Sequence, residues 1–400
     1  MSATPAVTKI PFLDLRSMND EVRDAIEAGW RRLLDSSAFV GGQAVTEFER
    51  QFAEFVGVRC AVGVGSGTDA LRIALQAVGV ERGDLVITVP HTFIATVEGI
   101  TQAGADPLFV DIDPVTYTMQ PEGLSSFLRE NVRVEAGRSV ERKSGRRVSC
   151  VVPVDLYGHP CDWDAIGAIA DQYRLRVVED ACQAHGATWR GAACGSFGNI
   201  SAFSFYPGKN LGAMGEAGAI TTQDPELAAR CMTLREHGQR ERYIHISADG
   251  SNARLDALQA VVLSAKLVHL QRWNDARRRA AATYRERLAD LDVVLPQEAP
   301  GARHVYHLFV VQVDDRDRVR RALDKAGIGT GLHYPVPLHL QVAYHSLGQG
   351  YGAFPASEGV AAAGLSLPMF PHISDDQIES ITRVLEETVG KRRSGAGRSR

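Results

Sequence analysis

The residues from Ser201 to Ile220, SAFSFYPGKNLGAMGEAGAI, place a single lysine among small, aromatic and turn-forming residues. Ala202 to Phe205 alternates small or hydroxyl side chains with aromatic ones, the period-2 pattern of a buried strand, and Pro207-Gly208 ends that strand. Lys209 therefore follows a buried strand in a tight turn, where its amine is poorly hydrated. Desolvation disfavours the charged form, so Lys209 is a candidate nucleophile near neutral pH. The alternative is an exposed lysine in an ordinary turn.

A glycine-rich junction lies upstream of this stretch. Cys60 to Val64 is expected to form a short buried strand, and a helix to about Val78 follows the sequence GVGSGTDAL at 63–71. Such a junction directs several backbone N–H groups towards one point at the positive end of the helix dipole, which favours an anion. It is not a Walker loop, because no Gly-Lys-Ser/Thr follows. The junction is either a phosphate site or only a tight strand-to-helix turn.

Apolar strands and amphipathic helices alternate between the junction and the lysine. Strands are expected at Leu85–Val89, Pro107–Ile112, Val148–Val154 and Arg176–Asp180, and helices at 91–103 and Asp162–Tyr173. Strands that are apolar throughout indicate a parallel sheet covered on both faces. Ligands in such α/β sheets bind at the carboxyl ends of the strands. The glycine-rich junction, Phe93, Asp180 and Lys209 all fall at such ends or in the turns beyond them.

The rest of the chain predicts further helices and a second region. Ser17–Asp35 and Thr46–Val56 have helical spacing, and Thr46 with Glu49 fits a capping box. Leu255–Glu286 is a helical stretch much longer than an average helix. Strands are then expected at His304–Val313 and Gly331–His333, and helices at Arg316–Ala326 and Asp375–Val389.

These patterns predict an α/β protein with two domains, the default for a chain of 400 residues. Residues 1–260 are assigned to a large domain and residues 261–390 to a long linking helix and a smaller α+β domain. Residues 130–147 are charged and without a clear period, so we expect an exposed loop or small hairpin. Residues 391–400 are basic and rich in glycine and serine, and they are expected to be a disordered tail.

Composition excludes several classes of protein. No stretch of about 20 apolar residues exists, so no membrane span is expected. The N-terminus lacks the pattern of a secretory signal. The six cysteines contain no C-x-x-C pair, which argues against a zinc or disulfide framework and favours a reducing cytoplasm. A net charge of −4 gives no reason to expect a nucleic-acid partner.

Six ordered motifs resemble one known family. They are SGTDAL at 66–71, PHTFIAT at 90–96, VDLYGHPCDW at 154–163, EDACQAHGA at 179–187, FSFYPGKNLGAMGEAGA at 203–219 and GSNARLDALQA at 250–260. Their order and identity resemble the DegT/DnrJ/EryC1/StrS sugar aminotransferases. The resemblance covers nearly the whole chain apart from residues 130–147 and the tail. It implies the fold-type I architecture of enzymes that use pyridoxal 5′-phosphate (PLP).

The resemblance also implies roles for individual residues. Lys209 matches the lysine that holds PLP as a Schiff base and moves the proton, and Asp180 matches the carboxylate that pairs with the pyridine nitrogen. The remaining matches are Phe93 stacked on the ring, Gln183 at the ring hydroxyl or face, Gly67, Thr68 and Ser204 in the phosphate cup, and Asn252 reaching the phosphate from the neighbouring subunit. Asn252 therefore implies a homodimer with shared active sites. No metal site is expected.

The function implied is amino transfer to a keto sugar. Glutamate would convert PLP to pyridoxamine phosphate, and the amine would pass to a nucleotide-linked keto sugar. The motifs are most similar to those of enzymes that aminate C3 of dTDP-linked 6-deoxyhexoses. Amination at C4 or of an inosose stays open. A PLP-dependent sugar dehydratase would have His at the position of Lys209, and a regulator would bind the cofactor without turnover or not bind it.

Overall fold

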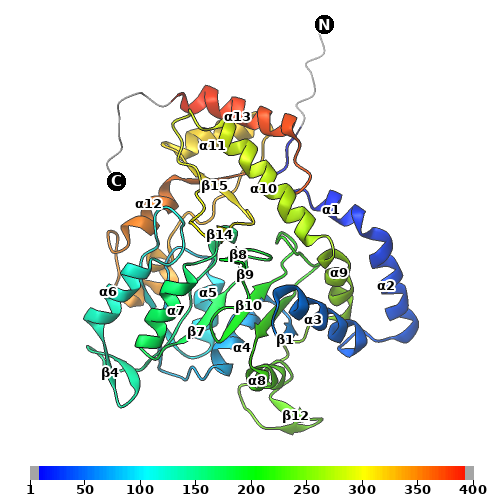
Figure 1. Ribbon diagram of the computed structural model, residues 1–400, viewed down its shortest axis with the longest axis vertical. Helices are drawn as coiled ribbons and strands as arrows, with labels where there is room; N and C mark the ends of the chain where they lie inside the picture. The colour runs from blue at the N-terminus through cyan, green and yellow to red at the C-terminus, as the bar shows by residue number, and fades with distance from the viewer. Residues whose placement is uncertain (1–8, 392–400) are drawn as a thin grey trace.

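A seven-stranded sheet forms the centre of the computed structural model, which describes residues 9–391 (Figure 1). In spatial order the strands are β1 (Cys60–Val64), β11 (Gly218–Thr222), β10 (Ile200–Ser204), β7 (Arg176–Asp180), β6 (Val148–Val151), β2 (Leu85–Thr88) and β3 (Asp106–Phe109). Only β11 runs antiparallel to its two neighbours, β1 and β10, and the other pairs between β10 and β3 are parallel. The mostly parallel sheet predicted from the apolar strands is confirmed.

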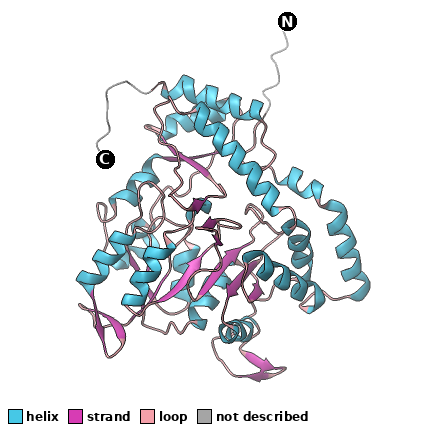
Figure 2. Ribbon diagram, in the orientation of Figure 1, coloured by secondary structure: helices cyan, strands magenta, loops and turns pink. Residues whose placement is uncertain are grey.

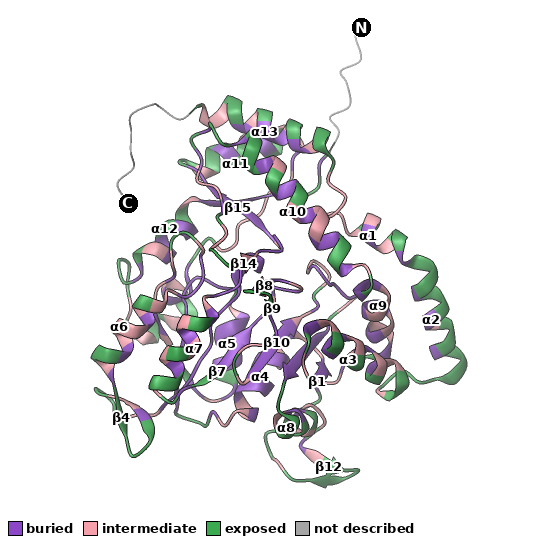
Figure 3. Ribbon diagram, viewed as in Figure 1, coloured by how far each residue is buried: buried purple, intermediate pink, exposed green. Residues whose placement is uncertain are grey.

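Alternate residues of the strands supply two cores, one on each face of the sheet. Val86 and Val178 pack with α4 (Gly67–Ala77), α5 (Ala95–Gln102) and α8 (Pro225–Arg235). Ile87 and Val177 pack on the opposite face with α6 (Pro121–Asn131) and α7 (Trp163–Gln172). On that face the β1–β11–β10 part of the sheet is covered by α3 (Gly42–Val56) and α9 (Ala257–Leu267). Figure 2 shows the strands lying between these helices, and Figure 3 shows that the central strands are buried. Burial on both faces explains why these strands are apolar throughout.

A third core lies in the C-terminal region, at the top of Figure 1. The antiparallel strands β15 (Phe309–Gln312) and β16 (Gly364–Leu367) pack with α10 (Leu270–Arg287), α11 (Arg316–Lys325) and α13 (Asp375–Val389). Ile10, from the other end of the chain, joins this core. Residues 338–360 instead contact the large sheet region through η2 (Leu338–Leu340), η3 (Val342–Leu347) and α12 (Pro355–Ala363). The domain boundary at residue 260 stays a prediction.

Small elements extend from this frame. Residues 130–147 include a hairpin of β4 (Val132–Glu135) and β5 (Arg138–Glu141), and a second hairpin pairs β12 (Gln239–Glu241) with β13 (Ile244–His245). Strand β14 (Ala302–Arg303) pairs with β8 (Thr188–Trp189), which pairs with β9 (Ala192–Ala193). The N-terminal helices are α1 (Leu15–Glu21) and α2 (Arg23–Ser36), and η1 (Leu156–Gly158) follows β6. Within residues 9–391, no helix combines the length and apolar character that a bilayer-spanning segment requires.

Several local predictions were wrong. The capping box at Thr46 and Glu49 does not form, because α3 already begins at Gly42, and Glu49 instead accepts a hydrogen bond from the Gly63 N–H at 2.8 Å. The helical stretch from Leu255 is two helices, α9 and α10, which are separated at Val268 and His269. Residues 331–333 form only an isolated bridge between Gly331 and Ser366. Residues 392–400 of the predicted tail lie outside the described residues.

Candidate active site

A cavity of about 660 Å³ lies at the carboxyl end of the parallel strands. Seven of the eight site residues named from the sequence line it, namely Gly67, Thr68, Phe93, Asp180, Gln183, Ser204 and Lys209. They come from six segments: the start of α4, the turn after β2, the ends of β7 and β10, and the turns after these two strands. The sheet therefore brings together side chains that are up to 142 positions apart in the sequence, from Gly67 to Lys209.

Lys209 lies in the turn that follows β10. Its backbone N–H donates to the carbonyl of Tyr206 at 2.8 Å, and the next residue, Asn210, is buried and donates to Asn274 Oδ1 at 2.8 Å. The turn is thus anchored to α10 while the Lys209 side chain lines the cavity. Burial lowers the pKa of Lys209, and the electrostatic interactions with Cys182 and Asp180 oppose this in part. A lowered pKa increases the fraction of neutral, nucleophilic amine.

Asp180 is the last residue of β7 and is buried. Its Oδ2 accepts a hydrogen bond from Thr96 Oγ1 at 2.7 Å, and its Oδ1 accepts one from the Cys182 N–H at 3.2 Å. Two donors from different elements therefore fix the carboxyl group at the wall of the cavity. A carboxylate held in this way can pair with a cationic group of a ligand.

The start of α4 forms a cradle with Ser204. Ser66 caps the helix, since its Oγ accepts a hydrogen bond from the Asp69 N–H at 3.1 Å, and Gly67 is the first helical residue. A Cβ atom at Gly67 would lie 2.6 Å from the Cβ atom of Ser204. Only glycine allows the helix to approach the end of β10 so closely. The free N–H groups of this first turn, together with the hydroxyls of Thr68 and Ser204, can bind a phosphate.

Phe93 and Gln183 lie on the other side of the cavity. The Phe93 side chain is 51% exposed, and its ring is tilted by 38° against that of Tyr334, with 5.6 Å between the centroids. Gln183 Oε1 accepts a hydrogen bond from the Tyr157 N–H at 2.7 Å, and Gln183 Nε2 donates to the Tyr334 hydroxyl at 3.1 Å. Phe93 thus leaves an aromatic face open in the cavity, and Gln183 has a fixed orientation.

Several residues that line the cavity were not predicted from the sequence, above all His307, His333 and Tyr334. They come from the C-terminal region, where no helical or strand period points to a site. His333 Nδ1 lies 2.8 Å from Ser366 Oγ, and burial lowers the pKa of His333 to about 4, so the imidazole is neutral near pH 7. The only sequence signal was the run HYPVP at 333–337, in which two prolines enclose a turn-forming segment.

Asn252 does not line the cavity of its own chain. It is exposed and forms an isolated bridge with Glu236, the residue that accepts a hydrogen bond from Arg254 Nη1 at 2.7 Å. His185, which lies in the EDACQAHGA motif, is fully buried beside the rings of Phe203 and Phe205, at centroid distances of 5.3 and 5.6 Å. Burial lowers the pKa of His185 to about 3, and it does not line the cavity. We therefore assign His185 a structural position.

The similarity of the chain to known proteins agrees with the function class that this geometry suggests. The sequence profile of the DegT/DnrJ/EryC1/StrS aminotransferase family matches residues 20–386. The chain belongs to this family. The family predicted from the six motifs is confirmed, and with it the activity class, sugar aminotransferase.

Three curated relatives illustrate the range of the family. The chain is 43% identical over 378 residues to erythromycin biosynthesis sensory transduction protein EryC1 of Saccharopolyspora erythraea, covering 94% of this chain and 99% of that protein. It is 41% identical over 388 residues to dTDP-3-amino-3,4,6-trideoxy-alpha-D-glucose transaminase of Streptomyces venezuelae, covering 97% and 98%. It is also 41% identical over 382 residues to UDP-N-acetyl-3-dehydro-alpha-D-glucosamine 3-aminotransferase of Acidithiobacillus ferrooxidans, covering 96% and 98%.

A solved structure supports the fold assignment. The structure of S. venezuelae DesV in complex with a ketimine intermediate matches this chain with a TM-score of 0.89 at 40% identity, and the match covers 96% of this chain and 100% of that one. The predicted fold-type I architecture is confirmed by this similarity.

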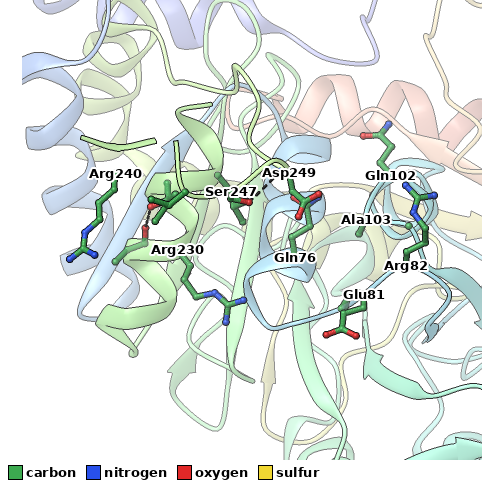
Figure 4. Close-up of a pocket in the computed structure, with 15 residues that line it drawn as sticks. Gln76, Glu81, Arg82, Gln102, Ala103, Arg230, Arg240, Ser247 and Asp249 are labelled. Atoms are coloured by element: carbon green, nitrogen blue, oxygen red, sulfur yellow. Dashed lines mark hydrogen bonds between the residues drawn. The ribbon is translucent and has the colours of Figure 1, made fainter. Parts of the chain in front are cut away.

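A second cavity, of about 680 Å³, lies between α4, α5 and α8, away from Lys209. Figure 4 shows its labelled arginines, Arg82, Arg230 and Arg240, spread around the rim rather than converging on one point. This cavity therefore lacks the convergent chemistry of the cavity at Lys209.

A buried acidic pair lies behind Asp180. One carboxylate oxygen each of Asp155 and Glu179 and the Sγ atom of Cys194, which are atoms that could bind a metal ion, all lie within 4.8 Å of one another. Glu179 already accepts hydrogen bonds from Gly195 N–H at 2.6 Å, from Phe197 N–H at 3.0 Å and from Ser201 Oγ at 2.6 Å. Burial raises the pKa of Asp155 to about 6 and that of Glu179 well above its usual value. We interpret the pair as sharing one proton, and the expected lack of a metal site stays a prediction.

Proposed function

We propose that the protein is a PLP-dependent aminotransferase that moves an amino group from glutamate to the keto group of a nucleotide-linked hexose. The observation on which this rests is the meeting of Lys209, Asp180 and the α4 cradle in one cavity. A nucleophilic amine, a fixed carboxylate and an anion site are the three groups that PLP chemistry requires. Family membership supports the same activity.

The residues present fit PLP. The cradle of Gly67, Thr68 and Ser204, which a Cβ at Gly67 would fill, suits the phosphate group. Asp180 suits the pyridine nitrogen, Phe93 offers a ring face, and Lys209 supplies the amine. When bound, PLP provides a carbonyl group that reacts with amines and an electron-withdrawing ring.

The protein groups have separate tasks in the proposed reaction. Lys209 Nζ holds and moves the proton at the carbon that bears the transferred nitrogen, which its lowered pKa favours. Asp180 keeps a positive charge at the ring nitrogen, with its own orientation fixed by Thr96 and Cys182. Phe93 and Tyr334, whose rings are in contact, provide an aromatic wall for the cofactor ring.

For the sugar, we propose a dTDP-linked 3-keto-6-deoxyhexose. The S. venezuelae relative is named for a dTDP-linked 3-amino sugar, and the A. ferrooxidans relative for a UDP-linked sugar with the keto group at C3. Both names place the amine at C3, which favours C3 over C4, while the nucleotide differs between them. Amination of an inosose and a role without catalysis are the competing functions. Lys209 argues against the dehydratase, which has His at this position.

A panel of sugars tests the proposed function. Protein loaded with pyridoxamine phosphate is mixed with dTDP-linked and UDP-linked 3-keto sugars, with a 4-keto sugar and with an inosose. We expect the dTDP-linked 3-keto sugar to give an aminated product by mass spectrometry and to restore the visible absorbance of PLP. Product from the inosose alone would establish the cyclitol activity, and cofactor binding without any product would support a regulator.

We further propose that the active sites are shared between two subunits of a homodimer. Asn252 is exposed and lies outside its own cavity, as a residue that serves a partner must. If Asn252 binds the partner's phosphate, PLP binding and dimerisation strengthen each other.

Subunit mixing tests the shared site. Asn252→Ala is expected to weaken PLP retention. In a heterodimer of Asn252→Ala with Lys209→Ala, one site has both defects and the other has neither, so activity should rise above the sum of the two homodimers. Subunit exchange is verified by native mass spectrometry. Verified exchange without a gain in activity would rule out the shared site.

A further inference from the structure

Tyr157 lies in the VDLYGHPCDW motif, and the proposed function gives it no role. Its side chain is 2% exposed, and its backbone has a left-handed conformation with φ +60°. From this position its hydroxyl donates to the carbonyl of His333, and its backbone N–H donates to Gln183 Oε1 at 2.7 Å. Tyr157 itself is not among the residues that line the cavity, but it contacts two residues that are.

The directions of these hydrogen bonds follow from the groups involved. A carbonyl oxygen only accepts, so the single hydroxyl proton of Tyr157 goes to His333. His91 Nε2, which lies 2.7 Å from the Tyr157 hydroxyl, must then be the donor. Burial lowers the pKa of His91 to about 4, so His91 is neutral and its proton is on Nε2. His91 therefore donates to the Tyr157 hydroxyl, which in turn donates to the His333 carbonyl.

The same reasoning fixes the amide of Gln183. Its oxygen faces the Tyr157 N–H, so its nitrogen faces the Tyr334 hydroxyl at 3.1 Å. Gln183 thus directs its amide nitrogen, and not its oxygen, towards Tyr334, which also lines the cavity. Tyr334 directly follows His333 in the chain, so the three hydrogen bonds form a closed circuit. The circuit runs from Tyr157 to Gln183, from Gln183 to Tyr334, and from His333 back to Tyr157.

Two further features belong to this circuit of hydrogen bonds. Gly158 has φ +94°, and a Cβ atom there would lie 2.8 Å from Val305 Cγ2 and 3.0 Å from the Gln183 carbonyl oxygen. Glycine is therefore needed for the segment of Tyr157 to approach Gln183. At the other end, the ring of Tyr334 rests against Phe93 with 5.6 Å between centroids. Tyr334 thus connects the circuit of hydrogen bonds to Phe93 in the wall of the cavity.

We propose that Tyr157 is a positioning residue: its hydroxyl, which His91 orients, holds the carbonyl of His333 and with it the place of Tyr334, while its backbone N–H holds the Gln183 amide. The proposal rests on the proposed function for what the cavity binds. It assigns Tyr157 no contact with substrate or cofactor.

Tyr157→Phe tests the proposal, because it removes one hydroxyl and keeps the aromatic ring and the backbone N–H. Tyr284→Phe is the matched control: Tyr284 is also a buried tyrosine, its hydroxyl donates to the carbonyl of Pro368 at 2.9 Å, and it does not line the cavity. Crystal structures of both variants are compared with the wild type. We expect His333 and Tyr334 to move in Tyr157→Phe, so that the 3.1 Å contact between Gln183 Nε2 and the Tyr334 hydroxyl lengthens, and to stay in place in Tyr284→Phe. Unchanged positions of His333 and Tyr334 in Tyr157→Phe would overturn the proposal.

PLP affinity gives a second readout through a double-mutant cycle with Tyr334→Phe. We expect Tyr157→Phe to raise the Kd of PLP about tenfold, the effect of leaving a buried hydrogen-bonding group unpaired. If Tyr157 acts through Tyr334, the double variant is less impaired than the product of the two single effects. The cycle of Tyr334→Phe with the control Tyr284→Phe should be multiplicative. Multiplicative effects for Tyr157→Phe would contradict the proposal.

Two variants of His91 keep the test decisive if Tyr157→Phe does not fold. His91→Gln retains an N–H donor for the Tyr157 hydroxyl and is expected to bind PLP nearly as the wild type does, whereas His91→Leu should weaken binding. Equal affinities of the two variants would contradict the proposal. If the wild type binds no PLP, the proposed function has failed, and the crystal structures alone decide on Tyr157.

Discussion

Lys209→Ala is expected to abolish amine transfer and to remove the covalent PLP adduct that borohydride reduces. The amine of Lys209 is the only lysine amine in the cavity of the described chain, and general acid–base groups contribute about 10² to 10⁴ to a rate. We expect a loss of at least about 10⁴-fold in kcat, since the nucleophile is lost as well. Turnover of glutamate and keto sugar, followed by mass spectrometry, measures the effect.

Two substitutions control for charge and folding. Lys209→Arg keeps the positive charge without a nucleophilic amine, so it should be as inactive as Lys209→Ala. Lys266→Met removes a buried lysine outside the cavity, which donates to the Gly212 carbonyl at 2.7 Å and whose pKa burial lowers to about 8. This variant is expected to retain the adduct. Substantial turnover by Lys209→Ala would show that another group moves the proton.

Asp180→Asn is expected to lower turnover by at least about 100- to 1,000-fold, or roughly 3–4 kcal/mol, the range for removing a group that stabilises transition-state charge. The variant keeps the shape but loses the negative charge that holds a proton on the ring nitrogen. The asparagine amide would also turn a donor towards either Thr96 or the Cys182 N–H, where Asp180 accepts from both. Steady-state kinetics with the accepted sugar gives the measurement.

Thr96→Val separates charge from orientation. It removes the 2.7 Å hydrogen bond to Asp180 Oδ2 but leaves the carboxylate charged. Its expected effect is about tenfold, close to the net value of one hydrogen bond to a charged group. Near wild-type turnover in Asp180→Asn would show that a different residue, or none, contacts the ring nitrogen.

Local sequence patterns predicted the fold wherever an element was uninterrupted. Arg176–Asp180 and Asp375–Val389 have the predicted bounds, because each is a continuous apolar or amphipathic run with clear ends. Strand β11 was not predicted, since its sequence follows a glycine-rich turn and reads as its continuation. The division between α9 and α10 at Val268 and His269 has neither proline nor glycine, so only tertiary packing places it.

The residues of the candidate site also fall into those that local sequence patterns predict and those that they do not. Gly67, Asp180 and Lys209 lie at or just beyond the carboxyl ends of strands of one mostly parallel sheet, so the topology alone brings them to one edge. His333 and Tyr334 come from a C-terminal segment whose position depends on the packing of two cores, which no local pattern encodes. The Asn252 prediction needs a second subunit.

The most direct test of the account is to locate the covalent attachment of PLP. The sequence contains six lysines, Lys9, Lys143, Lys209, Lys266, Lys325 and Lys391, so peptide mapping after borohydride reduction can distinguish all of them. The account predicts that the reduced adduct is found on the peptide that contains Lys209 and on no other. An adduct on any other lysine, or no adduct in protein that binds PLP, would contradict it.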